Sequence, residues 1–341
     1  MDKIKISDVA QLAGVSISTA SKALNGTGSI STETIERVFD AAKTLGYTPN
    51  RAAQMLAAKN KTIGVLLPTE PRAVYAMFEE GLHEALGAYE PFGVRSEFVY
   101  YDRRHDVGEF ISAMQALSRR CSGLIFIPTV ASELYEDVLR GIGIPKLSLQ
   151  IAVPAEVCPS VTVNEVMVGS IAADLMHLVC RANDGICETA IIAGGSTLDI
   201  HKKNIAGFAE AAHTHGIEIV AVHDSFDNLD TAYALTESLL ADHPRLSGIF
   251  VTSYVAPAVC ACLKQHGRAG DGGIRVIGVD VLGESGACLE DGSLTAAIYQ
   301  NQRQQAKTSV DVMLGLLRDE AMGSVSIKPE VVLLGNLPYY L

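Results

Sequence analysis

Apolar residues among the first 46 positions recur at the three- to four-residue spacing of helices. The pattern predicts one helix over 6–13, which ends at Gly14, and a second helix that follows Ser16 as its N-cap and runs to residue 24. A third helix is predicted from the N-cap Ser31 to Gly46. Three short helices with a glycine in the first turn are typical of a helix-turn-helix unit, whose second helix enters the major groove of DNA.

From residue 62 the pattern changes to short apolar runs that alternate with amphipathic stretches. The apolar runs predict nine strands, at 63–67, 94–100, 124–127, 146–149, 160–163, 190–193, 217–222, 249–252 and 276–279. The amphipathic stretches predict seven helices, at 76–88, 107–119, 132–141, 168–179, 204–216, 231–242 and 256–267. Strands that alternate with helices form parallel sheets covered on both faces, and nine strands fit two lobes better than one sheet.

The composition is that of a globular protein. Of the 341 residues, 48% are hydrophobic and 19% are charged, which argues against a disordered chain or a long coiled coil. The first ten residues lack the apolar core of a signal peptide and no apolar run reaches about 18 residues, so we expect a cytoplasmic protein without membrane contact. The seven cysteines include no CxxC pair, which predicts reduced thiols rather than disulfides or a zinc site.

Charge is divided unevenly along the chain. Residues 1–61 carry eight Lys or Arg and five Asp or Glu, a net charge of +3, whereas the whole chain carries −12. An acidic protein is repelled from polyanions in general, and a small basic module restores the attraction to phosphate groups locally. The division favours a nucleic-acid reader attached to another domain, although a charge of this size also occurs on ordinary domains.

Five short motifs follow one another in the first 50 residues at a distinctive spacing. They are Ile6-Ser7-Asp8-Val9-Ala10, Ala13-Gly14-Val15-Ser16, Thr19-Ala20-Ser21, Leu24-Asn25-Gly26 and Leu45-Gly46-Tyr47-Thr48-Pro49-Asn50. Together they closely resemble the lactose-repressor (LacI/GalR) family of bacterial transcription regulators. A looser similarity to that family continues through the rest of the chain, at Ile63-Gly64-Val65, Gly207-Phe208, Ile277-Gly278-Val279-Asp280 and Gln300.

The resemblance implies an N-terminal all-α helix-turn-helix domain and an α/β two-lobed domain that is periplasmic-binding-protein-like (type I). It divides the chain into the reader at 1–46, a hinge helix and linker at 47–61, and an effector-binding domain at 62–341. One lobe would comprise about 62–160 with 292–322, and the other about 161–291 with 323–341. It further implies a homodimer on a pseudo-palindromic DNA operator and a small-molecule effector, such as a sugar or polyol, between the lobes. No cofactor is expected.

The second helix is expected to read the DNA sequence. Ile17, Ser18 and Lys22 project from its first turns. Lys22 can donate to guanine O6 and N7, Ser18 can donate or accept, and Ile17 can pack on a thymine methyl group. The family more often has arginine in place of Lys22, so bidentate recognition is weakened. The side chains expected to position phosphates, or else to serve as caps or exposed surface, are Ser16, Thr19, Ser21 and Asn25.

Residues 51–58 resemble the hinge helix that joins reader and core in this family. The resemblance implies that Leu56 from each chain of a dimer wedges into the minor groove at the operator centre and kinks the DNA. A helix this short is marginal in water, so its folding can be coupled to DNA binding. Met55 and Leu56 could alternatively pack on the core. The other candidates for DNA contact in this region are Tyr47, Asn50, Ala53 and Gln54.

Ligands of open parallel sheets bind at the carboxyl ends of the strands, so the candidate effector residues are those that follow predicted strands. These are Thr69, Glu70, Arg72, Tyr75, Asp102, Arg103 and Thr129 in the first lobe, and Asn164, Ser196, Asp199, Ser253, Tyr254 and Asp280 in the second. The carboxylate of Asp280 could accept two adjacent hydroxyl groups, as the matching aspartate does in the family, or it could cap a helix. Gln300 resembles a family position that touches the ligand.

Asn204 departs from the family pattern, because many relatives have arginine four residues before the phenylalanine of the glycine-phenylalanine pair at 207–208. Asparagine offers a donor and an acceptor without charge, which favours a neutral, hydroxyl-rich effector. The nearby His201, Lys202 and Lys203 could instead accommodate an acid or a phosphate, or the lysines could be solvated helix surface.

The sequence contains no GxGxxG, P-loop, HExxH or GxSxG motif, so we expect a binding protein and not an enzyme. Two alternatives share the two-lobed architecture: a secreted sugar receptor and a cytosolic sugar-binding or sugar-modifying protein. The missing signal peptide and the helix-turn-helix pattern oppose the first alternative. Turnover of a bound sugar would indicate the second.

Overall fold

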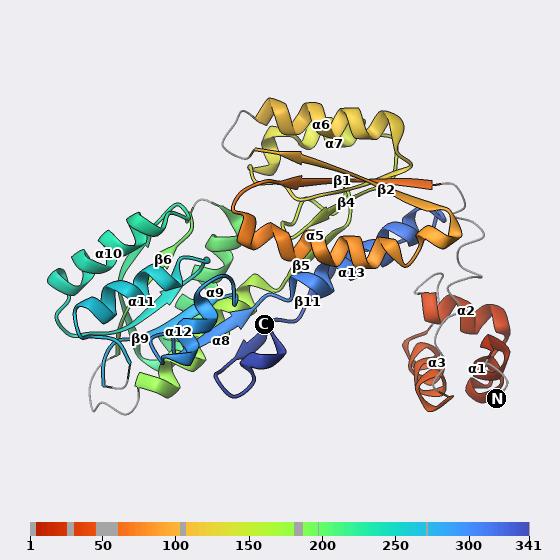
Figure 1. Cartoon of the computed structure of the whole chain (residues 1–341). Helices are drawn as coiled ribbons and strands as arrows, with labels where there is room; N and C mark the ends of the chain where they lie inside the picture. The colour runs from red at the N-terminus through yellow and green to blue at the C-terminus, as the bar shows by residue number, and fades with distance from the viewer. Residues whose placement is uncertain are drawn as a thin grey trace.

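The computed structural model of the protein describes residues 5–25, 31–45, 61–102, 107–180, 187–196, 198–270 and 272–340. The amino-terminal part is a three-helix unit of α1 (Ile6–Ala13), α2 (Ile17–Asn25) and α3 (Thr32–Leu45) (Figure 1). Val9, Ala20 and Val38, one from each helix, are fully buried in a shared core. The three helices predicted from the apolar spacing are therefore confirmed.

Two serines cap the second and third helices, as predicted. The Ser16 Oγ accepts a hydrogen bond from the Thr19 backbone N–H at 3.0 Å, and the Ser31 Oγ accepts one from the Thr34 N–H at 3.4 Å. Gly14 has a left-handed backbone with φ of 66°, which turns the chain sharply between α1 and α2. Local sequence signals thus determine where α2 begins and how the chain turns between α1 and α2.

The first lobe is a six-stranded parallel sheet with the strand order β11-β5-β4-β3-β1-β2. Its strands are β1 (Lys61–Pro68), β2 (Val94–Tyr101), β3 (Gly123–Phe126), β4 (Lys146–Leu149), β5 (Ser160–Val163) and β11 (Val325–Ile327). One face packs on α5 (Arg72–Gly87) and α13 (Gln302–Leu316), and the other on α6 (Val107–Arg120) and α7 (Glu136–Gly141) (Figure 1). Short 3-10 turns lie at Glu90–Phe92 and Ser132–Leu134.

The second lobe is a six-stranded sheet with the order β12-β10-β9-β8-β6-β7, in which only β12 runs antiparallel. Its strands are β6 (Cys187–Ala193), β7 (Ile217–Asp224), β8 (Leu246–Val251), β9 (Arg275–Val279), β10 (Ala296–Tyr299) and β12 (Glu330–Val332). One face packs on α8 (Glu165–Cys180) and α9 (Asp199–His215). The other face packs on α10 (Leu229–Asp242), α11 (Ala256–Gln265), α12 (Ser285–Glu290) and a 3-10 turn at Leu337–Tyr339.

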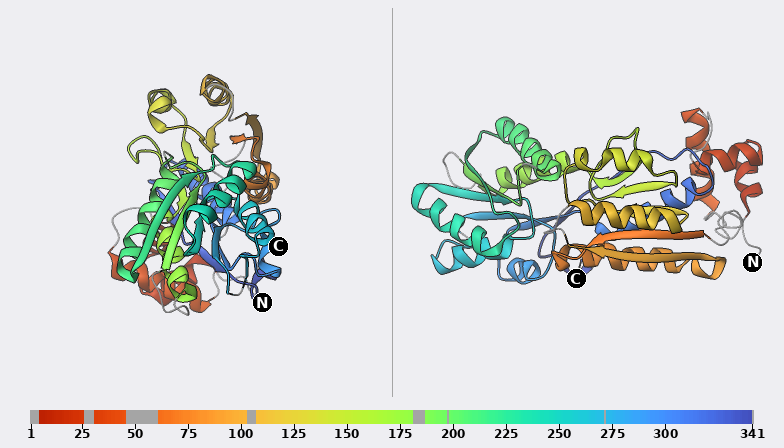
Figure 2. Two further views of the ribbon diagram at one scale, coloured as in Figure 1. Left: turned by 90° about the vertical axis from the view of Figure 1, so that its left-hand side faces the viewer. Right: turned by 90° about the horizontal axis from the view of Figure 1, so that it is seen from above.

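The chain crosses between the lobes three times: after β5, after β10, and between β11 and β12. Figure 2 shows the two lobes lying end to end with these connections at their junction. The predicted lobe limits are corrected by the sheet order. Strand β5 stays in the first sheet up to residue 163, β10 belongs to the second sheet although 292–322 was assigned to the first, and β11 belongs to the first although 323–341 was assigned to the second. A strand's partners lie far away in sequence, so periodicity cannot assign it to a sheet.

The nine predicted strands and seven predicted helices are all present; β4 and β5 have the predicted ends, and the ends of the others are shifted. The helix predicted over 132–141 is divided at Tyr135 into a 3-10 turn and α7. The pattern missed α12, α13, β11 and β12, and β10 corresponds to a strand-like segment over 294–299 that was not counted among the nine strands. No helix within the described residues is long and apolar enough to cross a bilayer.

Two glycines allow α8 and α9 to pack backbone against backbone. A Cβ added at Gly207 on α9 would overlap the carbonyl oxygen of Val166 on α8, and one added at Gly169 on α8 would overlap the Asn204 carbonyl oxygen on α9. Both helices cover one face of the second sheet.

Candidate functional site

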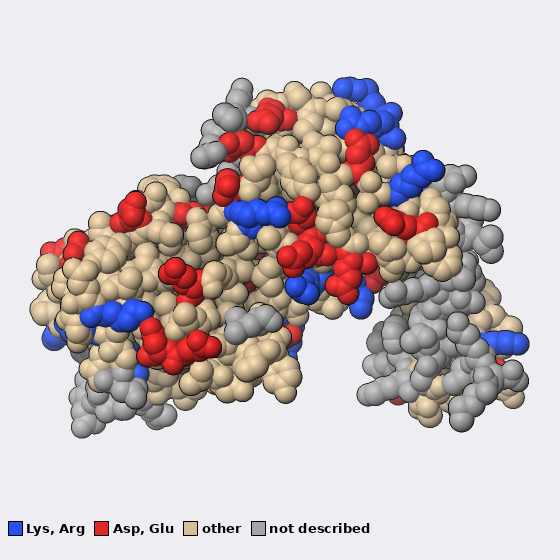
Figure 3. Space-filling model, in the orientation of Figure 1, with Lys and Arg blue, Asp and Glu red and all other residues tan. Residues whose placement is uncertain are grey.

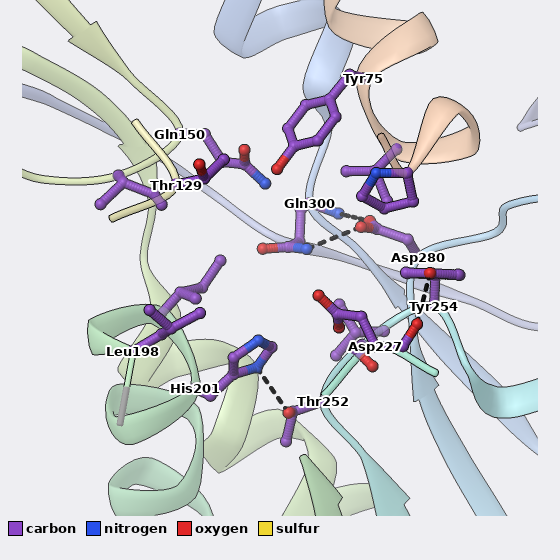
Figure 4. Close-up of a pocket in the computed structure, with 16 residues that line it drawn as sticks. Tyr75, Thr129, Gln150, Leu198, His201, Asp227, Thr252, Tyr254, Asp280 and Gln300 are labelled. Carbon is purple, nitrogen blue, oxygen red and sulfur yellow. Dashed lines mark hydrogen bonds between the residues drawn. The ribbon is translucent and has the colours of Figure 1, made fainter. Parts of the chain in front are cut away.

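A cavity lies between the two lobes at the carboxyl ends of the parallel strands (Figure 4). The space within it, counted together with its open mouth, is about 630 Å³. The first lobe contributes Pro71, Val74, Tyr75, Thr129, Gln150 and Ile151, and the second contributes Leu198, Ile200, His201, Asp227, Thr252, Ser253, Tyr254, Val279 and Asp280. Gln300 lies at the second crossover, directly after β10.

The parallel strands explain why these residues meet. Gln150, Thr252 and Asp280 each follow directly on a buried strand, β4, β8 and β9 respectively. Parallel strands present their carboxyl ends at one edge of a sheet, so the polar residues after them converge there. The carboxyl-terminal edges of the two sheets face each other, and the cavity lies between them.

Three of the cavity residues have left-handed backbones that are rare for residues other than glycine. The φ angles are 70° at Gln150, 56° at Asp227 and 64° at Asp280. Such conformations are unfavourable and concentrate at sites where the surrounding fold holds a side chain in a functional position. The neighbouring residues Phe226 and Asn301 share this conformation, with φ of 52° and 55°.

Asp280 is buried and held by Gln300. Its carboxylate accepts one hydrogen bond from the Gln300 backbone N–H and another from the Gln300 Nε2, both at 2.8 Å (Figure 4). Burial raises the pKa of the Asp280 carboxyl above its ordinary value, and the hydrogen bonds from Gln300 oppose this shift. The bond pair joins β9 to the crossover that leads into α13, so Asp280 connects the cavity to the junction of the lobes.

His201 and Asp227 approach each other across Gly194. The His201 Nδ1 shares a hydrogen bond of 2.8 Å with the Thr252 hydroxyl. A Cβ added at Gly194 would meet both the His201 imidazole and the Asp227 carboxylate, so only glycine leaves room for this pair. The Tyr254 hydroxyl donates to the Asp227 carbonyl oxygen at 2.7 Å, which anchors the loop after β7.

Two polar atoms in the cavity are buried and have no hydrogen-bond partner among the described residues. They are the Oε1 of Gln150 and the Oγ of Ser253, one from each lobe. A buried polar group without a partner is unfavourable by about 1–3 kcal/mol, so such groups mark places where a polar ligand gains hydrogen bonds. Apolar side chains of Val74, Ile151 and Ile200 complete the lining.

The structure brings only some of the predicted effector residues into the cavity. Those that line it are Tyr75, Thr129, Ser253, Tyr254, Asp280 and Gln300, together with His201. Those that do not are Thr69, Glu70, Arg72, Asp102, Asn164, Ser196, Asp199 and Asn204, as well as Lys202 and Lys203. Arg103 lies outside the described residues.

Local contacts explain several of these differences. Arg72 is exposed and forms an ion pair with Glu79 on the same helix. The Asn164 side chain caps α8 by accepting from the Met167 N–H at 3.0 Å. The Ser196 hydroxyl donates to Asp224 at 2.8 Å. Each of these three side chains therefore bonds to a neighbouring residue outside the cavity.

Asn204 is fully buried where α9 packs on α8, and neither polar atom of its side chain has a partner among the described residues. The packing at Gly169 and Gly207 holds it away from the cavity lining. Lys202, which could have supported an anionic ligand, is exposed on the outer surface of α9. The position before the glycine-phenylalanine pair therefore contributes no charge to the cavity.

Sequence reasoning missed several lining residues, notably Gln150, Ile151, Asp227 and Thr252. Gln150 directly follows the strand predicted at 146–149, so the rule used for the other candidates could have found it. Asp227 lies three residues beyond the end of β7, in a loop whose course depends on the contacts with Tyr254 and Gly194. No sequence signal indicated its position.

The predicted DNA-reading side chains are available on the surface of α2. Ile17 is 55% exposed although it is apolar, and Ser18 and Lys22 are also exposed. The Ser16 hydroxyl caps α2 and also shares a hydrogen bond of 2.8 Å with the Thr19 hydroxyl. Outside the described residues lie the other candidates for DNA contact: Tyr47, Asn50, Ala53, Gln54, Leu56 and the side chain of Asn25.

On the lobes, basic side chains occur in small groups among acidic ones in the view of Figure 3.

Both parts of the chain match known protein families. Residues 5–50 match the family described as bacterial regulatory proteins, lacI family. Residues 63–321 match the periplasmic binding protein domain. The ribose operon repressor of Bacillus subtilis (strain 168) is 23% identical over 97% of both chains, and catabolite control protein A of Priestia megaterium is 25% identical over 81% of this chain and 82% of its own.

Solved structures share the two-lobed fold. A glucose-galactose binding protein from Geobacillus stearothermophilus superposes with a TM-score of 0.72 at 22% identity, over 82% of this chain and 100% of that one. A LacI transcriptional regulator described for Bacteroides fragilis superposes with a TM-score of 0.70 at 21% identity, over 83% of this chain and 100% of that one. At these identities the likeness concerns the fold alone.

Proposed function

Because the chain belongs to the lacI family of bacterial regulatory proteins, we propose that it is a transcriptional repressor whose affinity for an operator is controlled by a small hydroxyl-rich metabolite. The observation that carries this proposal is the cavity between the lobes, which is lined by polar side chains from both sheets and belongs to the same chain as a helix-turn-helix unit. Relatives named for ribose and for catabolite control, and structural neighbours named as sugar-binding proteins, support a sugar or polyol as the effector.

The proposed regulation follows from the way the lobes are joined. A ligand that contacts Gln150 in the first lobe and Asp280 in the second favours one arrangement of the two lobes about the three crossovers. Strand β1 of the first lobe begins at Lys61, where the chain arrives from the reader. Any change in operator affinity caused by the effector requires an equal change in effector affinity caused by the operator.

We assign the reader to 1–46, the hinge helix and linker to 47–61 and the effector domain to 62–341. The functional unit is a homodimer on a pseudo-palindromic operator, with Leu56 at the centre of the DNA site. We propose a cytoplasmic location because bacterial DNA lies in the cytoplasm.

Selection of binding sites from a random duplex library tests the dimer, because two bound readers select two inverted half-sites at a fixed spacing.

Replacing Lys22 with alanine should weaken operator binding by about 5- to 150-fold and leave binding to random duplex DNA nearly unchanged, because one base contact contributes about 1–3 kcal/mol of discrimination. Fluorescence anisotropy on the selected operator and on a random duplex measures both affinities. Arg37→Ala is the matched control, since Arg37 is an exposed cation on α3 and not on the reading helix. Equal losses on both DNAs would reassign Lys22 to phosphate contact.

A thermal-shift panel of sugars, sugar acids, sugar phosphates and polyols tests the effector part of the proposal. A specific ligand at about 100 times its Kd should stabilise the protein by roughly 2.7 kcal/mol, a rise of several degrees in Tm. The stabilising compound is then added to the protein–operator complex, whose affinity should change, and recovered ligand should be chemically unaltered. Ligands that bind without any effect on operator affinity would contradict the proposed regulation, and turnover would indicate an enzyme.

A further inference from the structure

Two cysteines come together in the second lobe at the edge of the sheet opposite the cavity. Cys180 is the last residue of α8, and Cys187 is the first residue of β6. The cavity lies at the carboxyl ends of the strands, whereas the start of β6 belongs to the other edge. The Cys180 thiol donates a hydrogen bond to the Cys187 sulfur. The residues that join them, 181–186, lie outside the described residues.

Contacts with strands β6 and β8 fix the position of each sulfur independently. The Cys180 Sγ lies 3.8 Å from the carbonyl oxygen of Ser247 on β8, and the Cys187 Sγ lies 3.4 Å from the Oγ1 of Thr189 on β6. Thr189 is opposite Gly248 in the register of the two strands, and a Cβ added at Gly248 would approach the Thr189 hydroxyl. Both sulfurs therefore lie against the same paired segment of β6 and β8.

The two thiols differ in exposure and in acidity. Cys180 is buried, whereas Cys187 is partly exposed. The hydrogen bond between them lowers the pKa of the Cys187 thiol and raises the pKa of the Cys180 thiol. The thiolate is the form of cysteine that attacks oxidants, and oxidant-sensitive cysteines combine a lowered pKa, access from solvent and a second thiol nearby. Cys187 has these three properties.

The other five cysteines do not combine these properties, because all five are buried. Cys260 on α11 and Cys288 on α12 form a second hydrogen-bonded pair, but their exposed fractions are 0% and 5%. The Cys121 thiol donates to the Glu97 carboxylate at 3.8 Å, and burial together with that negative charge raises its pKa to about 11. Burial also raises the pKa of the remaining two thiols, Cys158 and Cys262.

We propose that Cys180 and Cys187 form a peroxide-reactive dithiol, which a hydroperoxide oxidises to a disulfide that links the end of α8 to the start of β6. In the first step the Cys187 thiolate attacks a peroxide oxygen and the O–O bond breaks. Cys187 becomes a sulfenic acid, and the departing alkoxide takes up the proton that the Cys187 thiol released.

In the second step the Cys180 sulfur attacks the Cys187 sulfur and the S–O bond breaks. The hydroxyl group leaves as water with the proton of the Cys180 thiol. In total the two thiols lose two electrons, and the hydroperoxide is reduced to an alcohol and water, or to two waters when it is hydrogen peroxide. The site is separate from the effector cavity and does not rest on the proposed function.

Peptide mapping of the full chain tests the disulfide. The reduced protein is treated with an equimolar amount of hydrogen peroxide, alkylated and digested with trypsin without reductant. Arg181 lies between the two cysteines in the sequence, so trypsin separates their peptides unless a disulfide joins them. We expect a joined pair linked through Cys180 and Cys187, and a fall in free thiols from seven to five. Fragment ions distinguish Cys180 from Cys158, which lies on the same tryptic peptide.

Three results of this mapping would overturn the proposal. The first is a Cys260–Cys288 disulfide that forms before the Cys180–Cys187 disulfide. The second is a Cys187 that is oxidised to sulfinic acid, or linked to a second chain, while Cys180 stays a thiol. The third is a set of seven thiols that persists until the protein is unfolded.

Cys180→Ser tests the order of the two steps. Without the Cys180 thiol the sulfenic acid at Cys187 persists, so its labelling by a dione reagent specific for sulfenic acids should rise about tenfold or more above the wild type. Cys187→Ser should leave Cys180 a free thiol after the same treatment. Equal labelling of Cys187 in the wild type and in Cys180→Ser would exclude Cys180 as the second nucleophile.

Cys121→Ser is the matched control for both variants. It makes the same change at a buried cysteine, whose thiol donates to the carboxylate of Glu97. The yield of the Cys180–Cys187 disulfide in this variant should equal that of the wild type. Thermal unfolding of each variant checks that it is folded, and the mapping of the wild-type chain stands without any variant.

Discussion

Replacing Gly207 with alanine should lower the free energy of unfolding of the second lobe by about 3 kcal/mol or more, the upper part of the range for overpacked cores. A methyl group there overlaps the carbonyl oxygen of Val166, which belongs to the backbone of α8 and cannot turn aside as a flexible side chain can. The two helices must separate, and Phe208, a fully buried residue of α9 itself, would lose its packing against the sheet. We expect Tm to fall by roughly 6 to 12 °C in thermal unfolding followed by circular dichroism.

Gly87→Ala provides the matched control for that variant. Gly87 lies at the end of α5, and a Cβ added there meets no atom within 4 Å. Alanine at a site with room and ordinary backbone angles is neutral or slightly stabilising, because it restricts the unfolded chain. An unchanged Tm in Gly207→Ala would show that α8 and α9 can shift apart without loss of stability, and the close packing of these helices would not be required.

Replacing Asp280 with asparagine should abolish the effector response and leave operator binding without effector intact. The carboxylate is the acceptor at the end of β9, and its replacement by a neutral amide removes hydrogen bonds of a charged group, each worth about 1.5–3 kcal/mol. Two such bonds correspond to a loss of about 100-fold or more in effector affinity. The substitution preserves the left-handed backbone at φ of 64°, which asparagine tolerates.

The measurement for Asp280→Asn is operator affinity with and without an effector concentration that saturates the wild-type protein. Asp319→Asn serves as control, because it makes the same change at an exposed residue with the same backbone conformation. Binding of DNA without effector should match the wild type, since the reader is built from α1 to α3 and contains no part of β9. A full effector response in Asp280→Asn would exclude this carboxylate from the ligand site.

Local patterns in the sequence were sufficient for the reader and for most individual elements. Ser16, Ser31 and Gly14 act within four residues of their own position, through caps and a left-handed turn, so their effect can be predicted without knowledge of the rest of the fold. The same holds for the buried strands, because an apolar run between helices has few other conformations that bury it. The carboxyl ends of those strands correctly indicated Tyr254 and Asp280 as cavity residues.

Other features of the site depend on pairing and packing between distant segments. The pattern could not place β10 in the second sheet, because this depends on its register with β9, Ala296 opposite Ile277. Nor could it show that Arg72 pairs with Glu79, or that packing at Gly169 and Gly207 buries Asn204 away from the cavity. Asp227 enters the cavity through a loop held by Tyr254, which lies 27 residues further along the chain.

The sequence by itself determined the helix-turn-helix unit, the alternation of strands and helices, and the polar residues that directly follow the strands. Only the tertiary structure decided which of those groups share one cavity, that Gln150 and Asp227 join them, and that no described lining residue is lysine or arginine. The physical reason is the range of the interactions. Caps, turns and periodicity act between residues a few positions apart, whereas a cavity between two lobes is built by strand pairing and side-chain packing across hundreds of residues.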